Sequence, residues 1–159
     1  MFRIFQIICL IGVLAISSCS TEKHITSTPP LELVVKLQKT PCYGDCPVYN
    51  FQALNDGHAT LIVGRITSAK FGLGLKEGEY EGTINSEDLK EIIDLAEALD
   101  YFSLKPKYDD EKVMDLPAAI SSIEGHRVFN RFEGPNLDPL YSLIEQKMVE
   151  IQWHPKPEN

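Results

Sequence analysis

The chain has 159 residues, of which 43% are hydrophobic and 24% charged, with 15 Lys and Arg against 23 Asp and Glu. This length and apolar content suit one globular domain with its own core rather than two domains. The formal net charge of −8, with no basic run, excludes a protein that binds the phosphate backbone of nucleic acid. It also argues against adhesion of the protein surface to anionic lipid head groups.

Residues 1–18 have the pattern of a signal peptide. Arg3 gives a positive start, and the apolar run from Ile4 to Ile16 is shorter than the roughly 20 residues that cross a bilayer. Residues 16–19, with the sequence ISSC, resemble the bacterial lipobox. In lipoproteins with that motif the Cys receives a diacylglycerol and becomes the first mature residue. The resemblance therefore implies a mature chain that begins at Cys19 and is anchored to a bilayer by its acyl chains.

Two alternatives for this segment are simple secretion after Ser17 or Ser18 and an uncleaved membrane anchor. Both leave Cys19 without a role, because ordinary signal cleavage does not need a cysteine. Ser20, rather than Asp, follows Cys19, and by the sorting rule described for enterobacteria this favours the outer membrane over the inner. Loss of residues 1–18 removes only Arg3, so the mature side-chain charge is 14 − 23 = −9.

Residues 19–30 are rich in Ser, Thr and Pro and have no apolar period, so they predict a lipidated Cys followed by a tether. From residue 31 the apolar residues alternate, which predicts strands over about 31–37, 49–53 and 59–63. Asp56-Gly57 indicates the hairpin between the second and third of these strands. A looser stretch around Gly72 and Gly74 leads to a fourth strand near 80–84.

The second half of the domain begins with a predicted helix, capped by Asn85 or Ser86, whose apolar face runs to about residue 99. Two more strands follow at about 119–124 and 127–132. A last helix, capped by Asn136, has one apolar face from Leu137 to Ile151. We therefore predict a single α+β domain over residues 31–152, with an antiparallel sheet of five or six strands and two helices packed on one face. Residues 153–159 are predicted to be a frayed tail.

The most individual segment is residues 40–49, with the sequence TPCYGDCPVY. It resembles the T-P-C-aromatic-G-x-C-P-x-Y signature of a bacterial lipoprotein family, domain of unknown function 6438. Further features occur in the same order as in that family: Asp56-Gly57, Tyr101-Phe102, Tyr108, Asp115-Leu116-Pro117, Gly125 and the final helix. The resemblance spans about residues 31–152. That family has no assigned activity, so the resemblance implies a fold and a location but no reaction.

Cys42 and Cys46 are the thiols that remain once Cys9 is removed and Cys19 is acylated. In an oxidising compartment, two Cys separated by three residues indicate a structural disulfide. One alternative is a copper(I) site completed by a distant histidine, either His126 or His58, because thiolates select Cu(I).

Thiol–disulfide exchange is a second alternative, and both alternatives depart from the known proteins of their kind. For the copper site, copper chaperones with a thioredoxin fold continue from such a motif into a helix, whereas residues 48–54 predict a strand. Exchange proteins usually use C-x-x-C at a helix N-terminus.

The connection from Ser103 to Pro117 is longer than most, and long loops can carry binding sites. We predict that it forms a recognition surface with the cysteine loop, and that Tyr43, Tyr108 and Asp115 contribute to it.

Asp109, Asp110 and Glu111, with Asp115, also raise the possibility of calcium binding. They lack the spacing of an EF-hand, which favours a solvated acidic loop.

The sequence contains no motif of a hydrolase or zinc protease, and we predict no catalytic residue, metal or cofactor. The leading hypothesis is a non-catalytic binding or structural module of the cell envelope. Its predicted partners are the bilayer, through acylated Cys19, and an unidentified envelope protein or ligand. The alternative is a copper-binding or thiol redox protein that uses Cys42 and Cys46.

Overall fold

The computed structural model describes residues 30–113 and 115–157. The signal peptide, Cys19 and the tether up to residue 29 lie outside the described residues. The described part contains three α-helices, a short 3-10 helix and one sheet of eight strands. The elements are β1 (Leu33–Lys39), β2 (Tyr49–Leu54), β3 (His58–Val63), α1 (Thr67–Phe71), β4 (Gly78–Thr83), α2 (Ser86–Ala98), the 3-10 helix η1 (Tyr101–Ser103), β5 (Lys107–Tyr108), β6 (Ala119–Ile123), β7 (His126–Asn130), α3 (Asp138–Glu150) and β8 (His154–Pro155).

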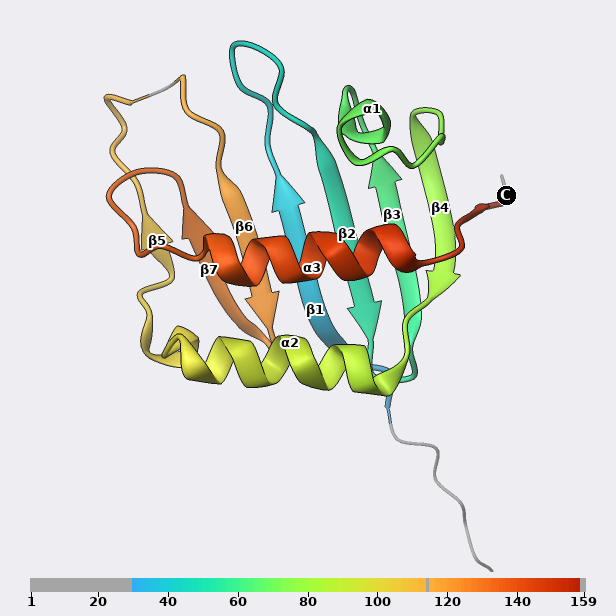
Figure 1. The fold of residues 1–159 in the computed structure, drawn as a ribbon. Helices are drawn as coiled ribbons and strands as arrows, with labels where there is room; N and C mark the ends of the chain where they lie inside the picture. The colour runs from blue at the N-terminus through green and yellow to red at the C-terminus, as the bar shows by residue number, and fades with distance from the viewer. Residues whose placement is uncertain (1–29, 114, 158–159) are drawn as a thin grey trace, which may run out of the picture.

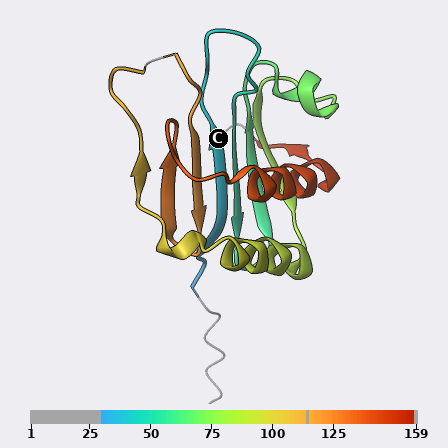
Figure 2. The same ribbon diagram turned by 60° about the vertical axis from the view of Figure 1, so that its left-hand side comes forward.

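The strands follow the order β5-β7-β6-β1-β2-β3-β4-β8 across the sheet. Neighbouring strands are antiparallel, except that β5 runs parallel to β7. Helices α2 and α3 lie across the same face of this sheet (Figures 1 and 2), and the opposite face carries no helix in the described part of the chain. The α+β class is therefore confirmed, with α2 and α3 in the predicted arrangement.

The predicted sheet of five or six antiparallel strands is wrong, because the sheet has eight strands and is mixed. The six longer strands match the six segments with alternating apolar residues. The additional strands, β5 and β8, have two residues each, which is too short for a period of two to be recognised in a sequence. The third helix, α1, has only five residues and lies in the stretch that we expected to be irregular.

Helix α2 begins as predicted. Asn85 is its N-cap, and the Asn85 side chain accepts a hydrogen bond of 2.7 Å from the backbone N–H of Asp88. Helix α3 begins one residue later than expected, at Asp138, and its N-cap, Leu137, makes no side-chain capping bond. Asn136 instead accepts a hydrogen bond from the backbone N–H of Asp138, which forms an Asx-type turn just before the helix.

The core lies between the sheet and these two helices. Fully buried side chains come from alternate positions of the central strands and from one face of each helix. They include Leu37, Phe51, Leu61, Ile92, Ile123, Leu140, Ile144 and Met148. Lys147 of α3 joins the two helices, because its ammonium lies 2.6 Å from a carboxylate oxygen of Asp88 and 2.7 Å from one of Glu91.

The segment predicted to be a frayed tail is instead paired with the sheet up to Lys156. Trp153 packs edge-on against Phe51, with ring centroids 6.2 Å apart, and its indole N–H donates to the carbonyl of Met148. Pro155, in β8, then pairs with Tyr80 of β4. Because a proline has no N–H to donate, it suits an edge strand and discourages a further strand from adding there.

The two ends of β1 face opposite ends of the domain. The chain enters the sheet at Leu33, after an exposed Leu31, and leaves it at Lys39 for the cysteine loop. Seven residues of extended chain separate these ends by about 20 Å. In Figure 1 the start of β1 accordingly lies at the bottom, whereas the loop between β1 and β2 lies at the top. In the described part of the chain, no helix has the length and apolar character needed to span a membrane.

Candidate functional site

The loop between β1 and β2 is closed by a disulfide between Cys42 and Cys46, whose Cα atoms are 5.8 Å apart. The pairing predicted from the sequence is therefore present. The chain continues from Pro47 into strand β2, as expected, and not into a helix. Gly44, inside the loop, has φ of +149°, a conformation that side-chain-bearing residues rarely adopt. Beside it, Tyr43 is 98% exposed at the tip of the loop.

The base of this disulfide loop is tied to both neighbouring strands. On one side, Thr40 and Ala118 exchange two hydrogen bonds: the N–H of Thr40 donates to the Ala118 carbonyl, and the N–H of Ala118 donates to the Thr40 hydroxyl. On the other side, the Arg65 guanidinium donates to the carbonyl of Cys42 at 2.8 Å. Backbone hydrogen bonds from Val48 to Arg65 and from Gly64 to Val48 extend the β2–β3 pairing beyond the strands. The loop is thus held at its base while its tip is exposed.

A polar cluster lies below the loop, where the end of β1 meets α3. The Tyr49 hydroxyl donates to the Glu145 carboxylate at 2.5 Å, and the Lys39 ammonium lies 4.3 Å from the centroid of the Tyr141 ring. Burial, the charge of Glu145 and this hydrogen bond together raise the pKa of Tyr49. Burial lowers the pKa of Lys39, while Glu145 and Asp138 oppose that effect. Because Tyr49 is almost completely enclosed, we interpret the cluster as a support that fixes α3 against the base of the loop.

The long connection predicted as a binding loop ends beside the disulfide loop. Ala118 follows this connection directly and is hydrogen-bonded to Thr40, at the base of the disulfide loop. The structure therefore brings the two predicted loops to one edge of the domain, with Tyr43 and Asp115 both exposed there. Tyr108 is half-buried in β5, and its hydroxyl accepts a hydrogen bond from the backbone N–H of Lys105. We call the disulfide loop and residues 109–113 and 115–117 together the loop edge.

Within the loop edge, Asp109 is held by internal ion pairs. One of its oxygens lies 2.5 Å from Nε of Arg131 and the other 3.1 Å from Nζ of Lys107. Burial alone would raise the pKa of Asp109, but the hydrogen bonds and charges of Arg131 and Lys107 outweigh it, and the pKa is lowered. Among the residues that the structure describes, no group of three or more His, Cys, Asp or Glu side chains is arranged to hold a metal ion.

The two histidines considered for a copper site lie far from the disulfide. His126 begins β7 and is paired with Ile123, which is in turn paired with Val35, four residues before the end of β1. That is about 13 Å of extended chain from Lys39, even before the loop begins. The His126 ring packs on Tyr101, with centroids 5.5 Å apart. His58 lies at the same lower end of the sheet, so neither histidine meets Cys42 and Cys46.

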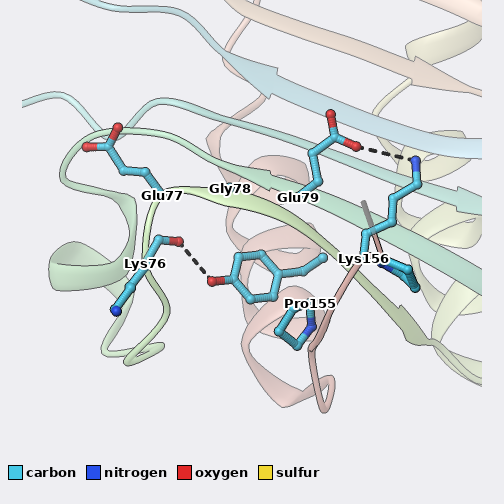
Figure 3. A pocket seen from close by; sticks show the side chains of 8 residues that line it. Lys76, Glu77, Gly78, Glu79, Pro155 and Lys156 are labelled. Carbon is cyan, nitrogen blue, oxygen red and sulfur yellow. Dashed lines mark hydrogen bonds and ion pairs between the residues drawn. The ribbon is translucent and has the colours of Figure 1, made fainter. Parts of the chain in front are cut away.

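A hollow of about 760 Å³ lies elsewhere, along the edge formed by β4 and β8. Figure 3 shows its lining: the turn from Lys76 to Gly78, an ion pair of 3.3 Å between Glu79 and Lys156, and the ring of Pro155. The Tyr80 hydroxyl is directed to the carbonyl of Lys76. Sequence analysis did not predict this hollow, because β8 was not expected.

Comparison with protein families gives a match to the model of the domain of unknown function DUF6438 over residues 33–145. The chain belongs to the DUF6438 family. This confirms the resemblance inferred from the segment around Cys42 and Cys46. The DUF6438 match runs from the start of β1 into α3 and includes the whole loop edge, whereas β8 lies outside it. Neither the curated proteins nor the solved structures contain a match.

Proposed function

We propose that this DUF6438 protein is a non-catalytic binding module of the cell envelope, anchored to the outer membrane through acylated Cys19. The observation that carries the proposal is the direction of β1, which starts at the tether and ends at the disulfide loop. An anchor at Cys19 would attach the bilayer to the end of the domain that lies opposite the loop edge. A surface directed away from the membrane is the one that a partner in the envelope reaches first.

The length of the tether is consistent with this role. Residues 19–30 span at most about 40 Å when fully extended, and β1 adds about 20 Å before the disulfide loop. A Ser-, Thr- and Pro-rich chain is flexible to semi-rigid and spends most of its time at shorter distances. The loop edge would therefore sample a layer a few tens of ångströms deep above the membrane.

The chemistry of the loop edge favours recognition over catalysis. Tyr43 offers an exposed aromatic ring on a loop that the disulfide restrains, so little conformational freedom is lost when a partner binds it. The polar cluster that contains Tyr49 and Glu145 lies underneath, where burial keeps it from a substrate. An exposed aromatic side chain on a restrained loop is typical of a residue that anchors a protein-binding surface.

Metabolic labelling with an alkyne-tagged palmitate tests the anchor. The full chain is expressed in a bacterial host, and wild type is compared with the Cys19→Ser variant after membrane fractionation. We expect label and membrane association in the wild type and loss of both in Cys19→Ser. An unlabelled wild-type protein would refute lipid anchoring.

Capture of envelope partners by the purified full-length protein tests the loop edge. Tyr43→Ala is expected to weaken capture of a specific partner about tenfold or more, the scale of an aromatic residue that dominates an interface. Leu31→Ala is the matched control, because Leu31 is also exposed but lies at the tether end. Equal capture by Tyr43→Ala and wild type would rule out a binding role for this loop.

A further inference from the structure

The face of the sheet that α2 and α3 do not cover carries alternate side chains of every long strand. We call it the open face. Its members follow from the strand register: positions next to a buried residue point away from the helices. From one side of the sheet to the other they are Arg127 and Phe129 (β7), Ile120 and Ser122 (β6), Lys36 and Gln38 (β1), Asn50 and Gln52 (β2), Thr60 and Ile62 (β3), and Glu79 and Glu81 (β4).

Charge is distributed unevenly over the open face. Arg127 and Lys36 are cationic on the β7 and β1 side, and Glu79 and Glu81 are anionic on β4. Glu79 is paired with Lys156, but neither Arg127 nor Glu81 forms an ion pair with another residue that the structure describes. The face therefore has a positive half and a negative half, each with an unpaired charge.

The register also aligns the open face in two rows that cross the sheet. One row contains Arg127, Ser122, Lys36, Gln52, Thr60 and Glu81, and the other contains Phe129, Ile120, Gln38, Asn50, Ile62 and Glu79. When the first row is read from its two ends, Arg127 corresponds to Glu81, a cation to an anion, and Ser122 corresponds to Thr60, a hydroxyl to a hydroxyl. The end members of the second row, Phe129 and Glu79, are not complementary, and Glu79 is paired with Lys156 of its own chain. In the second row, Ile120 corresponds to Ile62 and Gln38 to Asn50. The side-chain oxygen of Asn50 is buried and has no hydrogen-bond partner within the described chain.

We propose that the open face binds a second copy of this chain, related by a twofold axis that runs parallel to the strands between β1 and β2. This operation lays β7 of one copy over β4 of the other and keeps each row over itself. Arg127 then faces Glu81 of the second copy, and Ile120 faces Ile62. Gln38 faces Asn50 of the second copy, although the Asn50 oxygen is enclosed within its own chain and gains no donor from this contact. Such an isologous contact uses the same patch twice.

The direction of the axis is selected by charge. An axis across the strands would lay β7 over β7 and β4 over β4, so that Glu81 of each copy would face Glu79 of the other. The tether supports the same choice, in an argument that rests on the proposed function: an axis parallel to the strands keeps the Leu33 ends of both copies on the same side, so both could be anchored in one membrane. An axis across the strands would direct the two tethers to opposite sides.

The size of the open face sets the strength of the contact. Six strands about 4.8 Å apart, each contributing about five residues of 3.3 Å, cover roughly 500 Å² per copy. The two faces together bury about 1,000 Å², near the lower limit for a specific interface. A contact of this area with a polar centre is expected to be weak and sensitive to salt, and to form where anchoring concentrates the protein in a membrane.

Photo-crosslinking of the full chain in bacterial cells tests the proposal. The photoreactive residue replaces Thr83, an exposed position on the open-face side of β4, or Glu97, an exposed position on α2. We expect a crosslinked species of twice the protein's mass from the Thr83 position and not from the Glu97 position. Equal yields from both positions, or a crosslink from Thr83 only to another protein, would overturn the proposal.

Charge reversal supplies the second part of the test. Arg127→Glu alone or Glu81→Arg alone places like charges together and is expected to lower the dimer yield about tenfold or more. The two changes combined restore the opposite charges and are expected to restore the yield, which separates a direct contact from a folding defect. Failure of the double variant to recover overturns the proposed pairing. Palmitate label is read on the same samples, so an unlabelled protein that still crosslinks refutes the anchor and not the dimer.

Discussion

Removal of the Cys42–Cys46 disulfide gives a direct measure of how far it stabilises the loop edge. The double variant Cys42→Ser/Cys46→Ser removes the bond and leaves the length of the loop unchanged. The bond closes a ring of only five residues, since the two cysteines are four positions apart. The unfolded chain therefore gains little freedom when the bond is lost, and the loss of stability is expected to be small for a disulfide.

The chain-entropy relation for a five-residue ring gives about 2 kcal/mol at 25 °C. For a domain of roughly 130 residues, with an unfolding entropy of about 2.1 cal/mol/K per residue, this lowers Tm by about 8 °C. The fold itself should remain, because the core lies between the sheet and the helices and does not include either cysteine. The hydrogen bonds of Thr40 and Arg65 at the base of the loop also remain possible in the variant.

Thermal unfolding followed by circular dichroism measures the effect, on oxidised wild type, reduced wild type and the double variant. We expect reduced wild type and the variant to unfold at the same temperature, about 8 °C below oxidised wild type. Unchanged Tm in both would show that the unfolded state is not restrained by the bond. A loss of the folded signal at 25 °C would show that the disulfide loop stabilises the whole sheet, contrary to the reasoning from the core.

Three further predictions concern other parts of the domain. Gly57→Ala should lower the free energy of unfolding in urea by about 1–3 kcal/mol more than Gly125→Ala does. Both glycines have φ above +80°, but only at Gly57 would an added Cβ meet a backbone atom, the Ile84 carbonyl oxygen at 2.6 Å. Equal losses of stability in the two variants would contradict this. Burial raises the pKa of Tyr101 to about 12, so the folded state holds the phenol proton longer than the unfolded state, which titrates near 10. The stability that the protonated phenol contributes is complete below about pH 10 and is lost as pH rises towards 12. Between about pH 8 and 11 the urea midpoint of Tyr101→Phe should therefore fall less than that of wild type. Parallel falls of the two midpoints would contradict the raised pKa. Trp153→Ala should cost about 2 kcal/mol or more in the same assay, whereas no change would mean that the segment after α3 does not pack on the core.

The longer elements could be predicted because each buries one side. The alternation through Val35 and Leu37 in β1 places both side chains in the core, and the helical spacing of Leu140, Ile144 and Met148 does so for α3. A pattern of this kind needs several residues of one period. β5 and β8 have two residues each, and they form because neighbouring strands present free backbone groups, not because of their own sequence.

Helix α1 was missed for a different reason. It is preceded by Ile66 in the left-handed conformation, with φ of +67°, which a β-branched residue rarely adopts. Its first residue, Thr67, is fully buried and donates its hydroxyl to the carbonyl of Val48 at 2.5 Å. Tertiary contacts therefore determine this turn of helix, and no cap or periodicity in the sequence indicates it.

The candidate site was predictable in its local part only. Cys42 and Cys46 are close in sequence, and their spacing with Gly44 was enough to predict the bond. Asp109 and Arg131 are 22 positions apart, and Tyr49 and Glu145 are 96 positions apart. Pairs as distant as these follow from the order of strands in the sheet, which composition and periodicity do not specify.

The proposed dimer has a consequence for the loop edge. A twofold axis parallel to the strands keeps both disulfide loops at the same end of the pair, as it does both tethers. Two Tyr43 side chains would then face the same layer of the envelope, and the open faces would be occupied without covering either loop. A partner with two matching sites would bind the second loop at a high effective concentration, so the pair would hold it more tightly than one copy without any new contact. The charge-reversal variants test this as well, because Arg127→Glu should weaken capture of a bivalent partner even though Arg127 lies outside the loop edge.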